Sequence, residues 1–143
     1  MNNYFELGEF LRSTTAAEHK IQNYPDKFEY IDNLRELRDE ILNPLREDWG
    51  SAIRVNSGFR CKKLNDLLVG ASKTSVHMKG LAADLYPCNG EIDKFIDFCK
   101  EWFKDKTNFD QCIIEYGQNS RWIHIGLRNN KDEQRRLIFT MLI

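Results

Sequence analysis

Residues 111–127 read QCIIEYGQNSRWIHIGL, two short apolar segments on either side of a polar turn. Residues 111–116 and 121–127 have the period-two pattern of half-buried β-strands, in which successive side chains point to opposite faces. The intervening Gly-Gln-Asn-Ser is typical of a tight turn. The stretch therefore predicts an antiparallel hairpin, with Trp122, His124 and Gly126 on one face of its second strand.

Periodicity outside the hairpin predicts the other elements. Period-two segments indicate strands over 53–57 and 81–86, with a further strand in the tail over 136–142. Apolar residues three and four apart predict helices over 5–12, 25–49, 60–69 and 91–104. Pro44 should kink or divide the second helix near Leu42 or Asn43, because proline lacks an N–H, and Gly70 should cap the third. Together these elements predict an α+β domain with helices packed on one side of a small, largely antiparallel sheet.

Composition limits the classes of partner. The 143 residues, 41% of them hydrophobic, are enough for one core, so we expect a single domain over 1–143 and a monomer. A net charge of -1 gives no general field that would attract nucleic acid. No run approaches the roughly twenty apolar residues of a membrane span, so no membrane partner is expected. Four cysteines without a C-x-x-C pair argue against a cysteine-type zinc site.

The residues with the clearest chemistry lie in 75–84, SVHMKGLAAD, and in the later Trp122-Ile-His124. Alternation places Gly80, Ala82 and Asp84 on one face, so the carboxylate lies beside a hollow of small side chains. An unpaired buried charge is costly, and a bound cation explains this arrangement better than packing does.

Two imidazoles and one carboxylate, from His77, Asp84 and His124, make a typical catalytic zinc set with an open position for water. Zinc would lower the pKa of that water and polarise a carbonyl under attack. Each residue alone has an ordinary explanation: a loop histidine, a capping or ion-paired acid, and a half-buried histidine. Their combination predicts one Zn²⁺ site.

Three motifs in this order resemble the M15 family of zinc peptidases: Ser57-Gly-Phe-Arg60, Ser75-x-His77-x-x-Gly80-x-Ala82-x-Asp84, and Trp122-x-His124. The family includes D-alanyl-D-alanine carboxypeptidases, L-alanyl-D-glutamate endopeptidases of phage endolysins and Hedgehog-like structural relatives. The resemblance spans roughly residues 50–128. It implies the Hedgehog-like fold, His77, Asp84 and His124 as zinc ligands, and hydrolysis of an amide bond in peptidoglycan stem peptides by metal-bound water.

Further roles follow from the same resemblance. Arg60 matches the family's arginine, and its guanidinium suits a substrate carboxylate or an oxyanion forming on the cleaved carbonyl. Ser57, Ser75 and Trp122 are further candidates for substrate contact. The alternatives are a surface ion pair for Arg60, a loop end for Ser75 and a structural role for Ser57.

The sequence departs from one family pattern. Many members have E-x-x-H before the last histidine, but Arg121 stands at that position here. The hairpin brings Glu115 opposite residues 122–124, so Glu115 is the predicted general base. The same arrangement looks like that of the subgroup containing F-D-Q-x-I-x-E and W-[IV]-H. Alternatively, Glu115 pairs with Arg121 at the surface; Asp110 is a weaker candidate for the base.

Three functions stay open at this point. The first is a peptidase, either a D,D-carboxypeptidase or a phage-type endolysin endopeptidase. The second is a catalytically inactive metal-binding protein of the same fold that acts as a wall-binding or interaction module. The third is a non-haem iron oxygenase, disfavoured because His77 and Asp84 are seven residues apart instead of in an H-x-[DE] motif. With no secretory signal in the sequence, we expect cytoplasmic synthesis and release to the wall by another protein.

Overall fold

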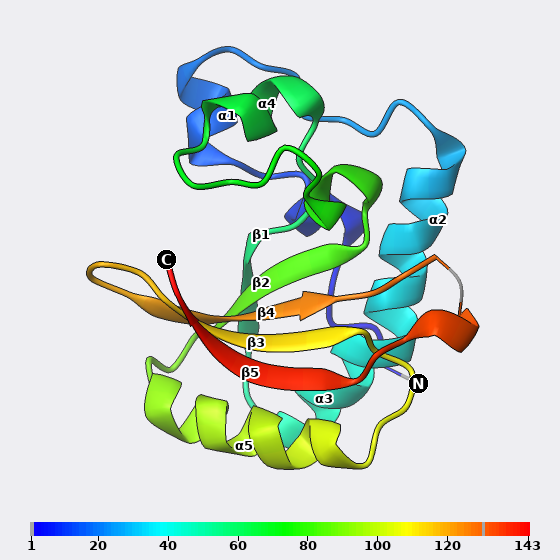
Figure 1. The fold of residues 1–143 in the computed structure, drawn as a ribbon, viewed down its shortest axis with the longest axis vertical. Helices are drawn as coiled ribbons and strands as arrows, with labels where there is room; N and C mark the ends of the chain where they lie inside the picture. Colours follow the sequence, from blue (N-terminus) through cyan, green and yellow to red (C-terminus); the bar gives the residue numbers. More distant parts are fainter. Residues whose placement is uncertain (1, 130) are drawn as a thin grey trace.

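A five-stranded sheet runs through the part of the chain that the computed structural model describes, residues 2–129 and 131–143. The strands lie in the order β1-β2-β4-β3-β5 (Figure 1) and have the bounds β1 (Ile53–Ser57), β2 (Ala82–Pro87), β3 (Gln111–Tyr116), β4 (Arg121–Gly126) and β5 (Leu137–Leu142). All neighbouring pairs are antiparallel except β3 and β5, which pair in parallel at the edge. The predicted α+β class and largely antiparallel sheet are confirmed.

The two faces of the sheet differ sharply in chemistry. In β4, Ile123 and Ile125 are fully buried in the hydrophobic core, and Ala83 and Leu85 of β2 join the same cluster. The residues between them, including His124, point to the opposite face, since successive strand residues alternate. The predicted division of these strands into an apolar and a polar face is confirmed.

Three helical segments cover the apolar face: α2 (Phe28–Leu37), α3 (Asn43–Trp49) and α5 (Ile92–Lys104). Their buried side chains and those of β1 to β4 form one hydrophobic cluster. In Figure 1, α5 lies below the sheet, α3 lies behind β5 and α2 extends upward at the right. These three helices thus lie on the apolar side of the sheet, as predicted, whereas the predicted helix over 60–69 contributes no buried side chain to this cluster.

Pro44 divides the long helical stretch, as predicted. A π-helical segment, η2 (Arg38–Leu42), links α2 to α3, and Pro44 lies in the first turn of α3. Proline has no N–H for a bond to the preceding turn, so one extra residue fits into the helix just before it. The stretch begins at Phe28, three residues later than Pro25 where the helix was predicted to start.

The remaining helices are shorter than predicted. The segment 5–12 contains a 3₁₀ helix, η1 (Leu7–Phe10), followed by α1 (Thr14–Glu18), whose first turn is capped by Ser13. Helix α4 covers Lys62–Leu67 and ends where Leu68 becomes extended. The predicted cap at Gly70 is wrong: this glycine, at φ +81°, lies in the loop beyond the helix end.

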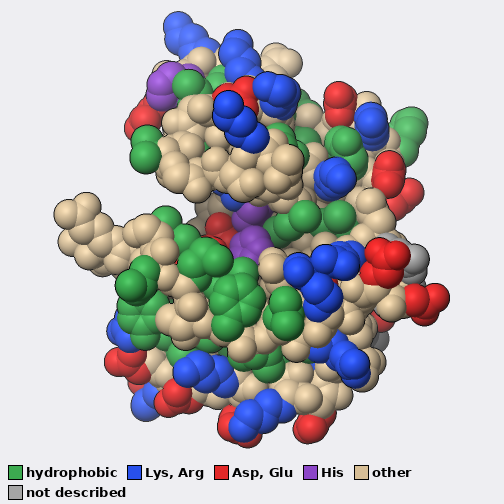
Figure 2. All heavy atoms as spheres, in the orientation of Figure 1, with side chains coloured by type: hydrophobic (Ala, Val, Ile, Leu, Met, Phe, Trp, Pro, Cys, Tyr) green, Lys and Arg blue, Asp and Glu red, His purple; other side chains and the backbone are tan. Residues whose placement is uncertain are grey.

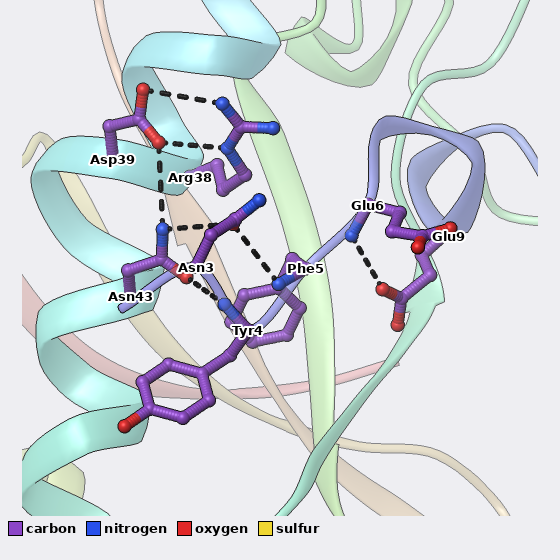
Figure 3. A network of polar contacts seen from close by, with 8 residues as sticks. All are labelled: Asn3, Tyr4, Phe5, Glu6, Glu9, Arg38, Asp39 and Asn43. Atoms are coloured by element: carbon purple, nitrogen blue, oxygen red, sulfur yellow. Dashed lines mark hydrogen bonds and ion pairs between the residues drawn. The ribbon is translucent and has the colours of Figure 1, made fainter. Parts of the chain in front are cut away.

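The N-terminal segment is bound to the helical layer by the buried side chain of Asn43 (Figure 3). The Asn43 Oδ1 atom accepts a hydrogen bond from the backbone N–H of Tyr4 at 2.9 Å. Its Nδ2 group donates to the Oδ1 atoms of Asn3 at 3.2 Å and of Asp39 at 3.5 Å. These bonds fix the chain just before Phe5, whose ring is 1% exposed in the core.

The helices give no indication of a membrane-spanning segment. None of the helices in the described part of the chain combines the length and the apolar content needed to cross a bilayer.

Candidate metal centre

The three predicted ligands lie together on the polar face of the sheet. Asp84 of β2 and His124 of β4 are direct partners in the antiparallel pairing, while His77 lies on a 3₁₀ helix, η3 (Val76–Lys79), that precedes β2. The Asp84 Oδ1 atom is 2.9 Å from His124 Nδ1 and 3.4 Å from His77 Nε2. One ligand atom from each residue lies within 4.8 Å of the other two. This is the convergence that a metal site requires.

The ring of His77 is oriented by a backbone carbonyl. Its Nδ1–H donates to the carbonyl oxygen of Gly58 at 2.7 Å, which places the lone pair on Nε2, the atom that faces Asp84. The backbone N–H of Arg60 in turn donates to the carbonyl of His77 at 3.1 Å. The Ser-Gly-Phe-Arg segment therefore holds His77 in place.

Two glycines allow this segment and η3 to pack closely. Gly80 ends η3 at φ +72°, and a Cβ atom there would lie 2.4 Å from the carbonyl oxygen of Tyr30. A Cβ atom at Gly58 would lie 2.6 Å from the carbonyl oxygen of Phe10. Both neighbours are backbone atoms, which cannot rotate away. The glycines of the two motifs are thus required by contacts that fix His77.

Burial and mutual contacts shift the pKa of each member of the triad. Burial would raise the pKa of Asp84, but the charges and hydrogen bonds of the two histidines outweigh it and hold that pKa far below its ordinary value. Burial lowers the pKa of His77, which favours its neutral form. The pKa of His124 is raised, because its interactions with Asp84 exceed the effect of burial. These shifts favour the ionised form of Asp84 and the neutral form of His77, in which a carboxylate and an imidazole can bind metal, whereas the shift of His124 favours its protonated form.

Glu115 lies beside the triad and is held by a tryptophan. Glu115 and Trp122 are direct partners across β3 and β4, and Ile113 is the partner of His124. The Trp122 Nε1–H donates to Glu115 Oε1 at 2.6 Å. Burial and the charge of Asp84 raise the pKa of Glu115. The predicted cross-strand position of Glu115 is confirmed; the hydrogen bond from Trp122 was not predicted from the sequence.

Arg121, the alternative surface partner of Glu115, and Asp110, the alternative general base, both have other partners in the structure. Arg121 faces the opposite side of β4 from His124 and forms an ion pair with Asp93 of α5. A carboxylate at position 121 of this strand would therefore point away from the triad. Asp110 is buried and accepts two side-chain hydrogen bonds from Arg135, at 2.8 and 3.0 Å.

Of the other predicted site residues, Arg60, Ser75 and Trp122 line the cleft that contains the triad. Arg60 lines the cleft above the triad, and burial lowers its pKa while Asp84 and Glu115 act in the opposite direction. Its Nε atom is buried and has no hydrogen-bond partner among the described residues. Ser75 also lines the cleft, and its Oγ accepts from the backbone N–H of His77 at 3.2 Å. Ser57 ends β1 opposite Asp84 and is outside the described lining of the cleft.

The triad opens into a cleft of about 850 Å³. Figure 2 shows purple histidine side chains at the floor of a hollow near the centre of this face. The loop 68–76 forms part of one wall, and β3, β4 and the end of β5 contribute to the other. A cleft of this volume accommodates a short peptide segment. The sequence did not predict that β5 would contribute to the wall of the cleft.

Comparison with known proteins agrees with this geometry. The family model described as Peptidase M15 matches residues 3–126, a range that contains the triad, Arg60 and Glu115. A comparison with curated proteins gave no match. The match covers most of the sequence and all the residues that converge on the cleft floor. The chain therefore belongs to the peptidase M15 family.

Proposed function

We propose that this chain is a zinc-dependent peptidase that hydrolyses an amide bond in peptidoglycan stem peptides, as a D,D-carboxypeptidase or as a phage-type endopeptidase. Membership of the peptidase M15 family supports a peptidase of the peptidoglycan type. The observation that carries the proposal is the convergence of His77, Asp84 and His124 within 4.8 Å at the floor of a cleft that Glu115 also lines.

The donor set fits zinc in a catalytic role. His77 offers Nε2, with Nδ1 engaged by the Gly58 carbonyl, and His124 offers Nδ1, the atom nearest Asp84. Three protein ligands leave a position open to the cleft, whereas structural zinc sites are closed by four. When bound, zinc would supply Lewis-acid activation of a water molecule and of the carbonyl under attack.

Glu115 is positioned to move the proton. With its Oε1 held by Trp122, Oε2 can accept a proton from the attacking water and pass it to the departing amine nitrogen. A pKa raised by burial makes the carboxylate a stronger base than a solvated glutamate. The new C–O bond forms on the carbonyl carbon, the C–N bond breaks, and the proton ends on the amine.

Arg60 is positioned to bind the oxygen that gains negative charge. Its partly buried guanidinium lies near Asp84 and Glu115, and its pKa, although lowered by burial, leaves it cationic at neutral pH. A desolvated cation next to the reacting carbonyl stabilises the developing oxyanion more strongly than it does the neutral carbonyl.

The test is the release of fragments from purified peptidoglycan, identified by mass spectrometry. We expect zinc-loaded protein to release peptides or D-alanine, and expect chelator treatment and an Asp84→Asn variant to stop the release. The identity of the new ends reports which amide bond is cut. Protein with full zinc occupancy that releases nothing would contradict the proposal and favour a binding protein of the same fold; stoichiometric iron after purification without added metal would favour an oxygenase.

A further inference from the structure

The cleft has two chemically different ends on either side of the triad. Along β3 and β4, the pair Ile113 and His124 lies between Glu115 and Trp122 on one side and Gln111 and Gly126 on the other. Each step of two residues along a strand is about 7 Å. In Figure 2 green side chains gather below and to the left of the central histidines, whereas a group of blue Lys and Arg side chains lies below and to their right. A bound peptide would therefore meet different chemistry at its two ends.

The basic end is built around one buried carboxylate. Asp110 is 4% exposed, and it accepts hydrogen bonds from Arg135 Nε at 3.0 Å, Nη2 at 2.8 Å and the backbone N–H at 2.9 Å. The Nε atom of Arg128 lies 3.3 Å from the same carboxylate. Two guanidinium groups thus share one negative charge, which leaves an excess of one positive charge in this cluster.

Both arginines remain open to the cleft. Their side chains are 40% and 43% exposed, and both line the cleft that contains the triad. Arg128 also borders a smaller hollow that Glu36 and Glu40 line. Among the described residues, Asp110 engages Nε and Nη2 of Arg135 and Nε of Arg128, so other N–H groups of each guanidinium remain to bind a further acceptor.

We infer that Arg128 and Arg135 form a subsite for a free carboxylate of the peptide substrate, on the side of the cleaved bond that lies over Gly126. The inference rests on the proposed function and adds a feature of the substrate to it. Guanidinium groups bind carboxylates with paired, charge-assisted hydrogen bonds, and the buried Asp110 fixes them before the substrate arrives. Stem peptides carry free carboxylates, so they supply the required group.

This subsite is separate from Arg60. The charges that act on Arg60 are those of Asp84 and Glu115, which places it at the triad itself. Arg128 and Arg135 lie beyond Gly126 in the chain and outside the matched range 3–126. The family match therefore does not assign them a role, and the inference concerns this chain in particular.

The experiment measures binding without turnover. Zinc-loaded Glu115→Gln protein is titrated with the synthetic stem peptide L-Ala-γ-D-Glu-L-Lys-D-Ala, and with forms in which the D-Glu or the terminal carboxylate is a carboxamide. The titrations are repeated with Arg128→Gln added, and with Arg136→Gln added as the control. Arg136 is exposed, lies outside the lining of the cleft, and loses the same charge. Arg135 is left intact because it also holds Asp110.

We expect one amidated peptide to bind about three- to tenfold more weakly than the free acid, as for a partly exposed charge-assisted pair. Arg128→Gln should reduce that difference, because only Arg135 then remains in the subsite, whereas Arg136→Gln should keep it. Equal binding of all three peptides, equal weakening by both substitutions, or no peptide binding at all would overturn the inference. Failure of the proposed function is a separate result, since it is the absence of cleavage by the wild-type protein.

Discussion

The two faces of the central sheet perform opposite tasks with alternate residues of the same strands. On one face, Ile123 and Ile125 are fully buried against the helices; on the other, His124 is hydrogen-bonded to Asp84 at the floor of the cleft. A slip of one residue in the pairing would exchange the two sets. The packing of the apolar face thus fixes the register that brings Asp84 opposite His124. Residues that stabilise the core and residues that line the cleft thus alternate along the same strand.

The largest expected effect of a change on the polar face is at Asp84. Asp84→Asn removes the charged ligand, so kcat/KM for peptide cleavage should fall at least about a thousandfold, as expected when a catalytic metal site is lost. Metal content after gel filtration should fall with it. On the apolar face, Ile125→Val should lower the free energy of unfolding by about 1 kcal/mol while zinc-loaded protein keeps its activity. An Asp84→Asn protein with wild-type activity would show that this residue is no ligand.

Glu115→Gln tests the acid beside the triad. The amide retains an oxygen that can accept from Trp122 but cannot take up a proton, so kcat should fall at least about a hundredfold while zinc stays bound. Arg121→Gln is the matched control, since position 121 faces α5, and its rate should stay within about twofold of wild type. A comparable loss in the control, or an unchanged rate in Glu115→Gln, would remove Glu115 from the mechanism.

Gly80→Ala tests the packing that places His77. The new Cβ atom would meet the carbonyl oxygen of Tyr30 at 2.4 Å, in a backbone with φ +72°. We expect unfolding by denaturant to show a loss of at least about 2 kcal/mol. Gly90 has a similar φ, +77°, with nothing within 4 Å, so Gly90→Ala should cost only about 1 kcal/mol. Equal losses would mean that the close approach to Tyr30 does not matter.

Trp122→Phe has the smallest expected effect, and this effect should be seen in the pH dependence of kcat/KM. The Trp122 N–H stabilises the ionised form of Glu115, so its removal raises the pKa of that carboxyl further. A base must be ionised to act, and the acid limb of kcat/KM should therefore move to higher pH. We expect about a tenfold loss below the new pKa and partial recovery above it. A uniform loss at every pH would indicate an effect on substrate binding instead.

The strands and the triad were predictable because their signals are local. Alternation in 111–127 and the turn residues between its two halves define the hairpin, and the hairpin places Glu115 opposite Trp122. The convergence of His77, Asp84 and His124 was predicted from their residue types, from the small side chains beside Asp84 and from the resemblance to M15 peptidases. Each of these features depends on near neighbours in the sequence or on the regular geometry of a strand.

Other features depend on contacts between distant segments, which no local pattern encodes. The Gly58 carbonyl that orients His77 is nineteen residues away in the chain. The parallel pairing of β5 with β3 brings Met141 next to Glu115 in the sheet. The sequence of the tail predicted a strand but did not indicate which strand it would pair with. Helix α4 ends before Gly70, so a glycine suited to a cap stands in the following loop. Tertiary packing decided each of these cases.

Titration of metal-free protein with zinc addresses the role of the polar face itself. Calorimetry should give one zinc ion per chain, and X-ray absorption should give two imidazole nitrogens and a carboxylate oxygen at about 2 Å from the ion. His124→Ala should weaken zinc binding at least about tenfold, with the fold retained. A protein that binds no stoichiometric zinc, or binds it equally well without His124, would show that these residues do not form a metal centre.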